Sequence, residues 1–175
     1  LGVGCADTYS AGLNDGDDGA SKKDINATMG TYSGQTFPSG NSQIAGRLRV
    51  QLSELSVPGA TYFMECQYVS NEDAQRGLNR NSQSVRLVNT NNPSNMSWIG
   101  NTVRYLCAVD FWGQQDPTVE VNDFISEDEG GPDIDGTYVV GSKVTDLGGG
   151  LWRYEYAVQN LTSDQAARGF TVTTD

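Results

Sequence analysis

The chain has 175 residues, a length typical of one domain, with 37% hydrophobic residues and 21 glycines. It carries 11 lysines and arginines against 22 aspartates and glutamates, a net charge of −11 that opposes binding to nucleic acid or to an anionic membrane surface. No run of about 18 apolar residues occurs, so the sequence predicts no membrane-spanning helix.

The first 42 residues are rich in Gly, Asp, Asn and Ser, which predicts an irregular N-terminal segment, packed on its own domain or exchanged with a neighbour. Residues 43–175 are predicted to form one β-sandwich domain. The chain begins at Leu1 without a basic start or an apolar stretch, as expected of a mature, processed chain. Together with the acidic surface, this favours a secreted protein, extracellular or at the cell surface.

Apolar residues alternate with polar ones in many short segments, the pattern typical of strands with one buried face. A helical turn is expected at residues 71–78, opened by Asn71 and closed by Gly77. Eight or nine strands at this spacing indicate an all-β fold, a single β-sandwich that is immunoglobulin-like or jelly-roll. The predicted strands are residues 47–52, 61–69, 85–88, 96–99, 102–112, 119–124, 138–144, 151–159 and, at the end of the chain, 170–174.

Three cysteines are present, and two of them fall in predicted strands. Alternation places Cys66 and Cys107 on the core-facing side of their strands. A disulfide between them would close a loop of 41 residues and stabilise the fold by roughly 4 kcal/mol. The alternative is two separate buried thiols. Cys5 is then unpaired, bonded to one of the other two, or bonded to a neighbouring subunit.

The sequence contains no histidine, which excludes Ser-His-Asp and Cys-His catalysis and histidine-ligated zinc. We therefore expect no enzyme activity and no catalytic residues. A glycosidase needs only two carboxylates, so this class is kept as the last alternative. The acidic residues on or beside strands each occupy a polar position, where a solvated face explains them; they are Glu54, Glu65, Asp110, Glu120 and Glu155.

Two acidic loops are candidate calcium sites, and no other cofactor is expected. Calcium binds six to eight oxygens on flexible loops, which carboxylates and backbone carbonyls supply. Neither loop has the helix-loop-helix spacing, and acidic turns are common in an acidic protein. The candidate ligands are Asn14, Asp15, Asp17, Asp18, Asp128, Asp133 and Asp135. Three glycosylation sequons begin at Asn26, Asn95 and Asn160.

Three stretches of the sequence together resemble a family of uncharacterised secreted bacterial all-β proteins. They are residues 1–14 (LGVGCADTYSAGLN), residues 71–88, and residues 141–161, which contain KVTDLGGGLWRYEYAVQNL. The resemblance implies an exported bacterial β protein and carries over no catalytic residue. The chain also resembles, more loosely, the protomers of extracellular helical fibrils.

This second resemblance favours a structural subunit of a self-assembling extracellular filament, with copies of the chain as partners. A terminal segment that adds to a neighbour's open sheet edge is one route to such a polymer. The candidate contact residues at the two termini are Leu1, Val3, Tyr9, Leu13, Phe170 and Val172. The alternative is a secreted carbohydrate-binding or adhesin module that stacks sugar rings on Trp98, Trp112 or Trp152.

Overall fold

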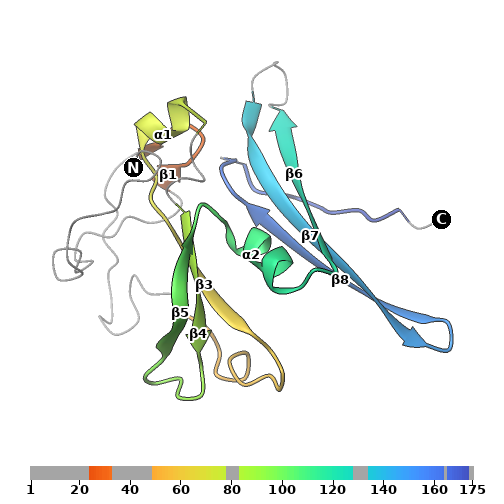
Figure 1. The fold of residues 1–175 in the computed structure, drawn as a ribbon. Helices are drawn as coiled ribbons and strands as arrows, with labels where there is room; N and C mark the ends of the chain where they lie inside the picture. Colours follow the sequence, from red (N-terminus) through yellow and green to blue (C-terminus); the bar gives the residue numbers. More distant parts are fainter. Residues whose placement is uncertain (1–23, 33–48, 78–82, 128–133, 164, 174–175) are drawn as a thin grey trace. The chain divides into compact units, whose positions relative to one another are not determined.

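The computed structural model describes residues 24–32, 49–77, 83–127, 134–163 and 165–173 (Figure 1). It contains one two-stranded and two three-stranded antiparallel sheets, so the predicted all-β class is confirmed. The chain divides between Ala108 and Val109 into two compact units, each with one three-stranded sheet. The predicted domain boundary between residues 42 and 43 lies outside the described residues, and the sandwich type stays a prediction.

The first unit contains a short hairpin and a three-stranded sheet in the order β3-β4-β5. Antiparallel pairing sets Tyr62 opposite Val88 and Val88 opposite Trp98. Its core includes Val85, which is fully buried. The elements are β1 (Ile25–Asn26), β2 (Thr31–Tyr32), β3 (Tyr62–Gln67), α1 (Asn71–Gln75), β4 (Gln83–Asn89) and β5 (Ser97–Arg104).

The helical turn predicted at residues 71–78 is present as α1. Its N-cap is Ser70, whose hydroxyl accepts a hydrogen bond from the amide of Asp73, so the cap lies one residue before the predicted Asn71. Gly77 follows the helix with a φ of +66°, a conformation that glycine adopts without steric cost. The capping residue and the closing glycine therefore predicted this helical turn correctly, to within one residue at its start.

The strand predicted at residues 47–52 is wrong over its described part, because residues 49–51 have no regular structure and a turn begins at Leu52. The amide of Gln51 donates to the Glu54 carboxylate at 3.1 Å, and the amide of Leu55 donates to the Leu52 carbonyl at 3.2 Å. These local bonds use groups that a strand would pair with a neighbour. Val50 and Leu52 are consequently exposed instead of facing a core.

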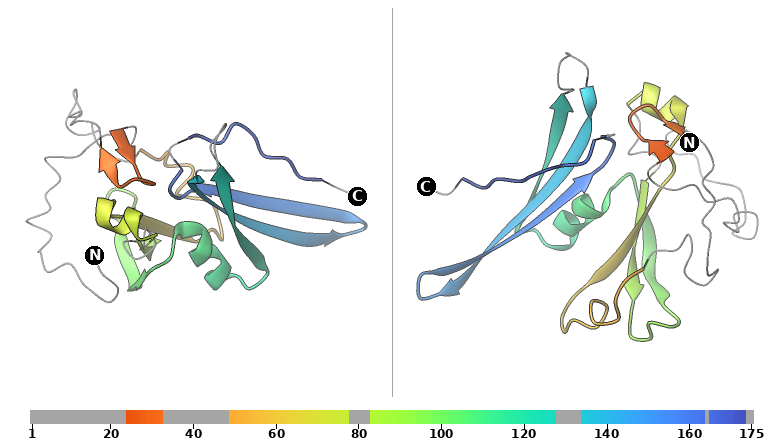
Figure 2. Two further views of the ribbon diagram at one scale, coloured as in Figure 1. Left: turned by 90° about the horizontal axis from the view of Figure 1, so that it is seen from above. Right: turned by 180° about the vertical axis from the view of Figure 1, so that it is seen from behind.

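The second unit is a helix and a three-stranded meander, β6-β7-β8 (Figures 1 and 2). The elements are α2 (Ala108–Gln115), β6 (Val119–Glu127), β7 (Ile134–Gly148) and β8 (Leu151–Asn160). β7 and β8 form one long hairpin, with Tyr138 opposite Asn160 and Asp146 opposite Trp152. Gly148, Gly149 and Gly150 all have positive φ, which a tight turn at the hairpin tip requires.

The single long strand predicted at residues 102–112 is also wrong. β5 ends at Arg104, Tyr105 adopts a φ of +69°, and α2 begins at Ala108. A non-glycine residue in the left-handed region interrupts strand geometry. The apolar positions of this segment fit a helix as well as a strand, since Val109 and Trp112 are three residues apart and share a helical face.

The helix α2 packs on one face of the β6-β7-β8 sheet. A Cβ atom placed on Gly141 of β7 would lie 2.9 Å from the Val109 side chain and 2.9 Å from the Trp112 ring. On the helix side, a Cβ on Gly113 would lie 2.9 Å from a methyl group of Val121. The two glycines therefore allow helix and sheet to approach closely. We call this side of the sheet the covered face; its β7 residue Val139 is fully buried.

Candidate functional site

The opposite side of the same sheet carries its largest apolar side chains, and we call it the open face. Pairing places the even-numbered residues of β6, β7 and β8 on this side, because strand side chains alternate. Phe124, Trp152 and Tyr154 are 55%, 54% and 53% exposed. The apolar members of the open face are Phe124, Tyr138, Val140, Val144, Trp152, Tyr154, Tyr156 and Val158.

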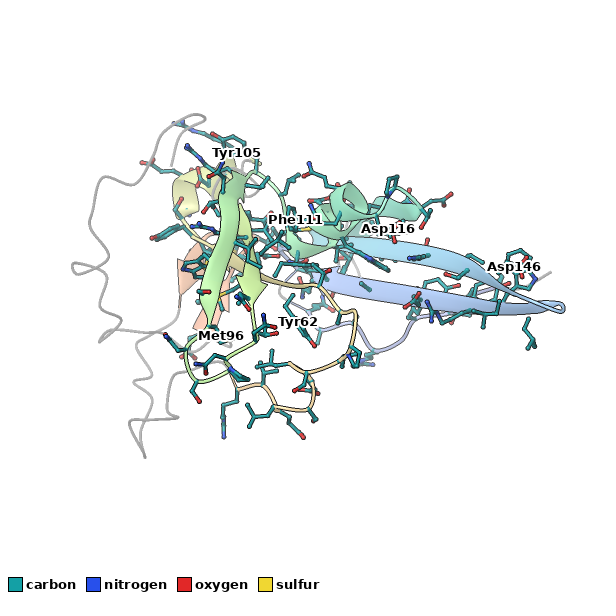
Figure 3. All side chains as sticks on the ribbon, turned by 60° about the horizontal axis from the view of Figure 1, so that its bottom comes forward. Tyr62, Met96, Tyr105, Phe111, Asp116 and Asp146 are labelled. Carbon is teal, nitrogen blue, oxygen red and sulfur yellow. The ribbon has the colours of Figure 1, made fainter. Side chains whose placement is uncertain are left out.

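The open face carries charge of one sign. Glu120 and Asp146 lie on it by register, whereas the basic residues Lys143 and Arg153 occupy odd positions on the covered side. Figure 3 labels Asp146 toward the far end of the β7–β8 hairpin, where its carboxylate accepts a hydrogen bond from the amide of Gly148 at 2.7 Å. A partner for this face therefore has to be apolar or aromatic, and neutral or basic.

The sheet also has two open edges. Its order is β6-β7-β8, so within the described chain no strand pairs with the outer side of β6 or of β8. β8 has 10 residues and β6 has 9. Long edge strands present rows of backbone donors and acceptors that can pair with another chain. Edge and open face together form a surface suited to association.

Part of the open face is covered by the end of the chain. The rings of Tyr156 and Phe170 meet edge-to-face with centroids 5.1 Å apart. A groove of about 590 Å³ remains between this end and the sheet. Its lining residues are Phe124, Tyr138, Val140, Val158 and the segment 167–171. The predicted contact residues Phe170 and Val172 are still 51% and 42% exposed, and neither lies in a strand.

An ion pair fixes the end of α2 on the covered side. Lys143 of β7 donates to the Asp116 carboxylate at 2.5 Å, and the hydroxyl and amide of Thr118 donate to the other carboxylate oxygen at 2.7 and 3.0 Å. These hydrogen bonds, with Lys143 contributing most, lower the pKa of Asp116 from 3.8 to about 2. Both side chains are partly buried, and the pair joins the end of α2 to β7.

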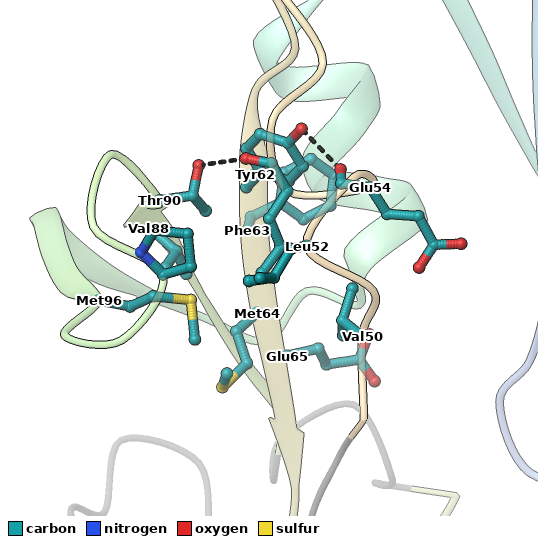
Figure 4. Close-up of a pocket in the computed structure, with 12 residues that line it drawn as sticks. Val50, Leu52, Glu54, Tyr62, Phe63, Met64, Glu65, Val88, Thr90 and Met96 are labelled. Carbon is teal, nitrogen blue, oxygen red and sulfur yellow. Dashed lines mark hydrogen bonds between the residues drawn. The ribbon is translucent and has the colours of Figure 1, made fainter.

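The first unit has a separate pocket of about 600 Å³ beside β3 (Figure 4). The Tyr62 hydroxyl at its rim donates to the Glu54 carbonyl at 2.7 Å, and Thr90 donates to the Leu55 carbonyl at 3.0 Å. Most of its lining is aliphatic or aromatic: Val50, Leu52, Leu55, Tyr62, Phe63, Met64, Val88, Pro93 and Met96. Its surface suits an aliphatic group better than a sugar.

Two of the five candidate carboxylates, Glu54 and Glu65, line this pocket. Each already accepts a backbone hydrogen bond, Glu54 from Gln51 at 3.1 Å and Glu65 from Ala108 at 2.6 Å. Glu155 pairs with exposed Arg153 at 3.2 Å, as expected for a solvated position. These contacts explain the three carboxylates by local structure.

Cys66 and Cys107 form no disulfide in the structure. Cys66 lies on β3 and is exposed, whereas Cys107 lies between β5 and α2 and is fully buried. The expectation of two core-facing positions is wrong for Cys66. It is met for Cys107, although that residue lies outside any strand. Cys5 lies outside the described residues.

The predicted calcium ligands Asn14, Asp15, Asp17, Asp18, Asp128 and Asp133 lie outside the described residues, and Asp135 is described only as part of the β7 backbone. Within the described ranges, no group of three acidic, cysteine or histidine side chains could hold a metal ion. Calcium stays a prediction. The four N-terminal contact candidates Leu1, Val3, Tyr9 and Leu13 likewise lie outside the described residues.

The three sequon asparagines differ in their surroundings. Asn95 lies exposed in the turn before β5. The Asn26 side chain accepts a hydrogen bond from the amide of Met29 at 2.9 Å. The Asn160 side-chain nitrogen, to which a glycan would be attached, donates to the carbonyls of Ser163 and Gln165 at 2.9 and 3.0 Å. Of the three, Asn95 is the most accessible acceptor.

The three tryptophans differ in exposure and surroundings. Trp98 is 53% exposed on β5, with the Arg86 guanidinium 5.8 Å from the centre of its ring. Trp112 is half-buried, with its ring against β7 at Gly141. Trp152 belongs to the open face. Alternation along the strand predicted at residues 151–159 places Trp152, Tyr154, Tyr156 and Val158 on one side, and the pairing of β8 confirms this.

Comparison with known proteins found no match to a family model, to a curated protein or to a solved structure. Among the described helices, none is long and apolar enough to cross a membrane. The open face is therefore the feature on which a functional proposal must rest.

Proposed function

We propose that the chain is a structural subunit of an extracellular filament, in which copies associate through the open face and the free edges of the β6-β7-β8 sheet. The observation that carries this proposal is the open face itself. Large exposed apolar patches on a soluble domain mark interaction surfaces, because their exposure to water is unfavourable. The acidic composition and the resemblance to secreted and fibril-forming proteins support an extracellular location.

Assembly has to overcome a net charge of −11 on every copy. Identical charges repel over a Debye length of about 30 Å at 0.01 M salt and only about 8 Å at 0.15 M. Apolar contact is weakened far less by salt. Polymerisation is therefore expected to increase with ionic strength, unlike an association driven by opposite charges.

The test is light scattering with negative-stain microscopy of the purified chain across a salt series. The wild type should form filaments as salt rises. The double variant Trp152→Ser/Tyr154→Ser should remain monomeric with an unchanged unfolding midpoint, because both side chains are more than half exposed. Arg153→Ser, on the same strand but the other side, is the matched control and should still assemble. A wild type that stays monomeric at every salt concentration would overturn the proposal.

The second candidate function is binding of a carbohydrate. Trp152, Tyr154 and Tyr156 form a row on the open face, with alternate residues about 7 Å apart along the strand. Aromatic faces of this kind stack on the apolar sides of sugar rings. Polysaccharide should then change tryptophan fluorescence in the wild type and in Trp98→Phe, but not in Trp152→Phe. Silence of the wild type on a glycan array and in this titration would remove this candidate.

A further inference from the structure

The end of the chain consists of an anchored part and a loosely held part. Leu161, Thr162 and Ser163 are buried. The amides of Leu161 and Thr162 both donate to the Thr137 carbonyl, at 3.0 and 3.2 Å, and the Thr162 hydroxyl accepts from the Thr137 amide at 2.9 Å. Gly136 leaves space here, since a Cβ on it would lie 2.4 Å from the Ser163 backbone. The chain is therefore firmly attached to its own unit up to Ser163.

The following residues, 165–173, are all exposed. The carbonyl of Gln165 accepts hydrogen bonds from Tyr138 and Asn160, at 2.5 and 3.0 Å. Beyond it, residues 166–173 make no hydrogen bond with any other described residue. Among the described residues, their one ring contact is that of Phe170 with Tyr156. Figure 1 shows this segment turning back from the end of β8 toward the C-terminus. We call residues 166–173 the terminal arm.

The arm makes an aromatic contact with the open face but leaves part of that face uncovered. Phe170 meets an aromatic residue there, yet a groove of about 590 Å³ stays open between arm and sheet. The arm and Gln165 contain one basic residue, Arg168, and no acidic one. The open face carries Glu120 and Asp146, and the whole chain is acidic. Asp175 follows the arm in the sequence, so this end adds no net charge to the open face of another copy, and its contact there is mainly apolar.

We propose that the terminal arm is exchanged between copies: it leaves its own open face and docks on the open face of the next copy, with Phe170 against that copy's Tyr156. This inference rests on the proposed function, because it assigns the contact that links the subunits. The donor and the acceptor are different surfaces of one chain. Every copy can therefore both give an arm and receive one, and such a head-to-tail contact that does not close produces a fibre.

Exchange has a small energetic cost. The arm loses no hydrogen bond to the described part of its own chain when it leaves, and its ring contact is made again on the neighbour. Exchange of an identical element is a low-cost route to association for this reason. Eight extended residues span at most about 28 Å, so the receiving groove has to lie within that distance of the donor's Gln165. The free backbone groups of the arm can in addition pair with an edge strand.

The experiment uses two full-length variants in a background in which Cys5 and Cys66 are both changed to Ser. One carries Thr171→Cys in the arm, and the other carries Val140→Cys in the groove. They are mixed, brought to the salt concentration at which the wild type polymerises, treated with a short bismaleimide, and mapped by peptide mass spectrometry. A link between positions 171 and 140 joins two copies, because no single chain contains both cysteines. Arm exchange predicts this link in polymer and its absence in monomer at low salt.

Phe170→Ser is the second variant, with Val50→Ser as its matched control for loss of an equally exposed apolar side chain. Phe170→Ser should raise the critical concentration for assembly about tenfold, and Val50→Ser should leave it unchanged. If filaments form without the 171–140 link and Phe170→Ser polymerises normally, arm exchange is wrong while the filament proposal stands. If the wild type forms no filaments at all, both are wrong.

Discussion

The two faces of the β6-β7-β8 sheet contain apolar residues of different size. The covered face has small or β-branched ones: Val121 and Gly141 lie against α2, and Val139 is fully buried. The open face has three aromatic residues in a row on β8, with Phe124 and Tyr138 across the sheet. Small side chains allow a helix backbone to approach closely, whereas large ones bury more area against a partner.

This difference shows that burial within the unit does not follow the size of the side chain. Trp152 and Tyr154, two of the largest side chains of the sheet, remain more than half exposed, and among the described residues one ring contact, from Phe170 to Tyr156, partly covers the open face. The apolar area that is still exposed on the open face can be buried by contact with another copy. The proposals of filament assembly and arm exchange both follow from this imbalance.

The largest expected difference between the two faces is in the loss of stability when a valine is truncated on each side of β7. Val139→Ala on the covered face should reduce the free energy of unfolding by about 2 kcal/mol, from lost burial plus the cavity left behind. Val144→Ala on the open face, where the side chain is 48% exposed, should change it by about 0.5 kcal/mol or less. Urea unfolding of both variants measures the difference. Equal effects would mean that the two faces are buried alike.

Adding volume tests the close approach of α2. Gly141→Val should lower the free energy of unfolding by about 1–2 kcal/mol, because its side chain must displace Val109 and Trp112. Those contacts are side chains and can shift, which limits the effect. Ser142→Val is the control, since the next residue points to the open face. Thermal unfolding followed by near-ultraviolet circular dichroism also reports on Trp112. A stable Gly141→Val variant with an unchanged Trp112 signal would contradict the described packing.

The open face could be predicted from the sequence because it depends on a local pattern. Alternation of Trp152, Tyr154, Tyr156 and Val158 fixes their common side as soon as the segment is a strand. What the alternation could not tell is which side of the strand would be covered. Such alternation is typical of a strand with one buried face, whereas Trp152 remains more than half exposed.

The helix α2 could not be predicted, because its sequence fits two periods. Val103, Tyr105, Val109 and Phe111 alternate as in a strand, and Val109 and Trp112 also share one face of a helix. Contacts with residues distant in the sequence, such as Gly141, favour the helix over the strand. These contacts cannot be inferred from the sequence of the segment itself. Residues 49–52 illustrate the same limit, since the Glu54 carboxylate accepts a hydrogen bond from the Gln51 amide, which a strand would use for pairing.

The smallest predicted effect concerns the ion pair that holds the end of α2 on the covered face. The pKa of Asp116 is lowered from 3.8 to about 2 by hydrogen bonds from Lys143 and Thr118, so the folded state binds its proton less readily than the unfolded state. The stabilisation is therefore complete above the ordinary pKa and is lost as the pH falls through about 2. Asp116→Asn should be less stable than the wild type at neutral pH, and the difference should vanish at the acid end of a pH series of unfolding midpoints.

Glu155→Gln, which breaks only the exposed pair with Arg153, is the control and should follow the wild type closely. A deficit of Asp116→Asn that stays constant down to pH about 2 would show that its carboxylate acts by packing and not by charge.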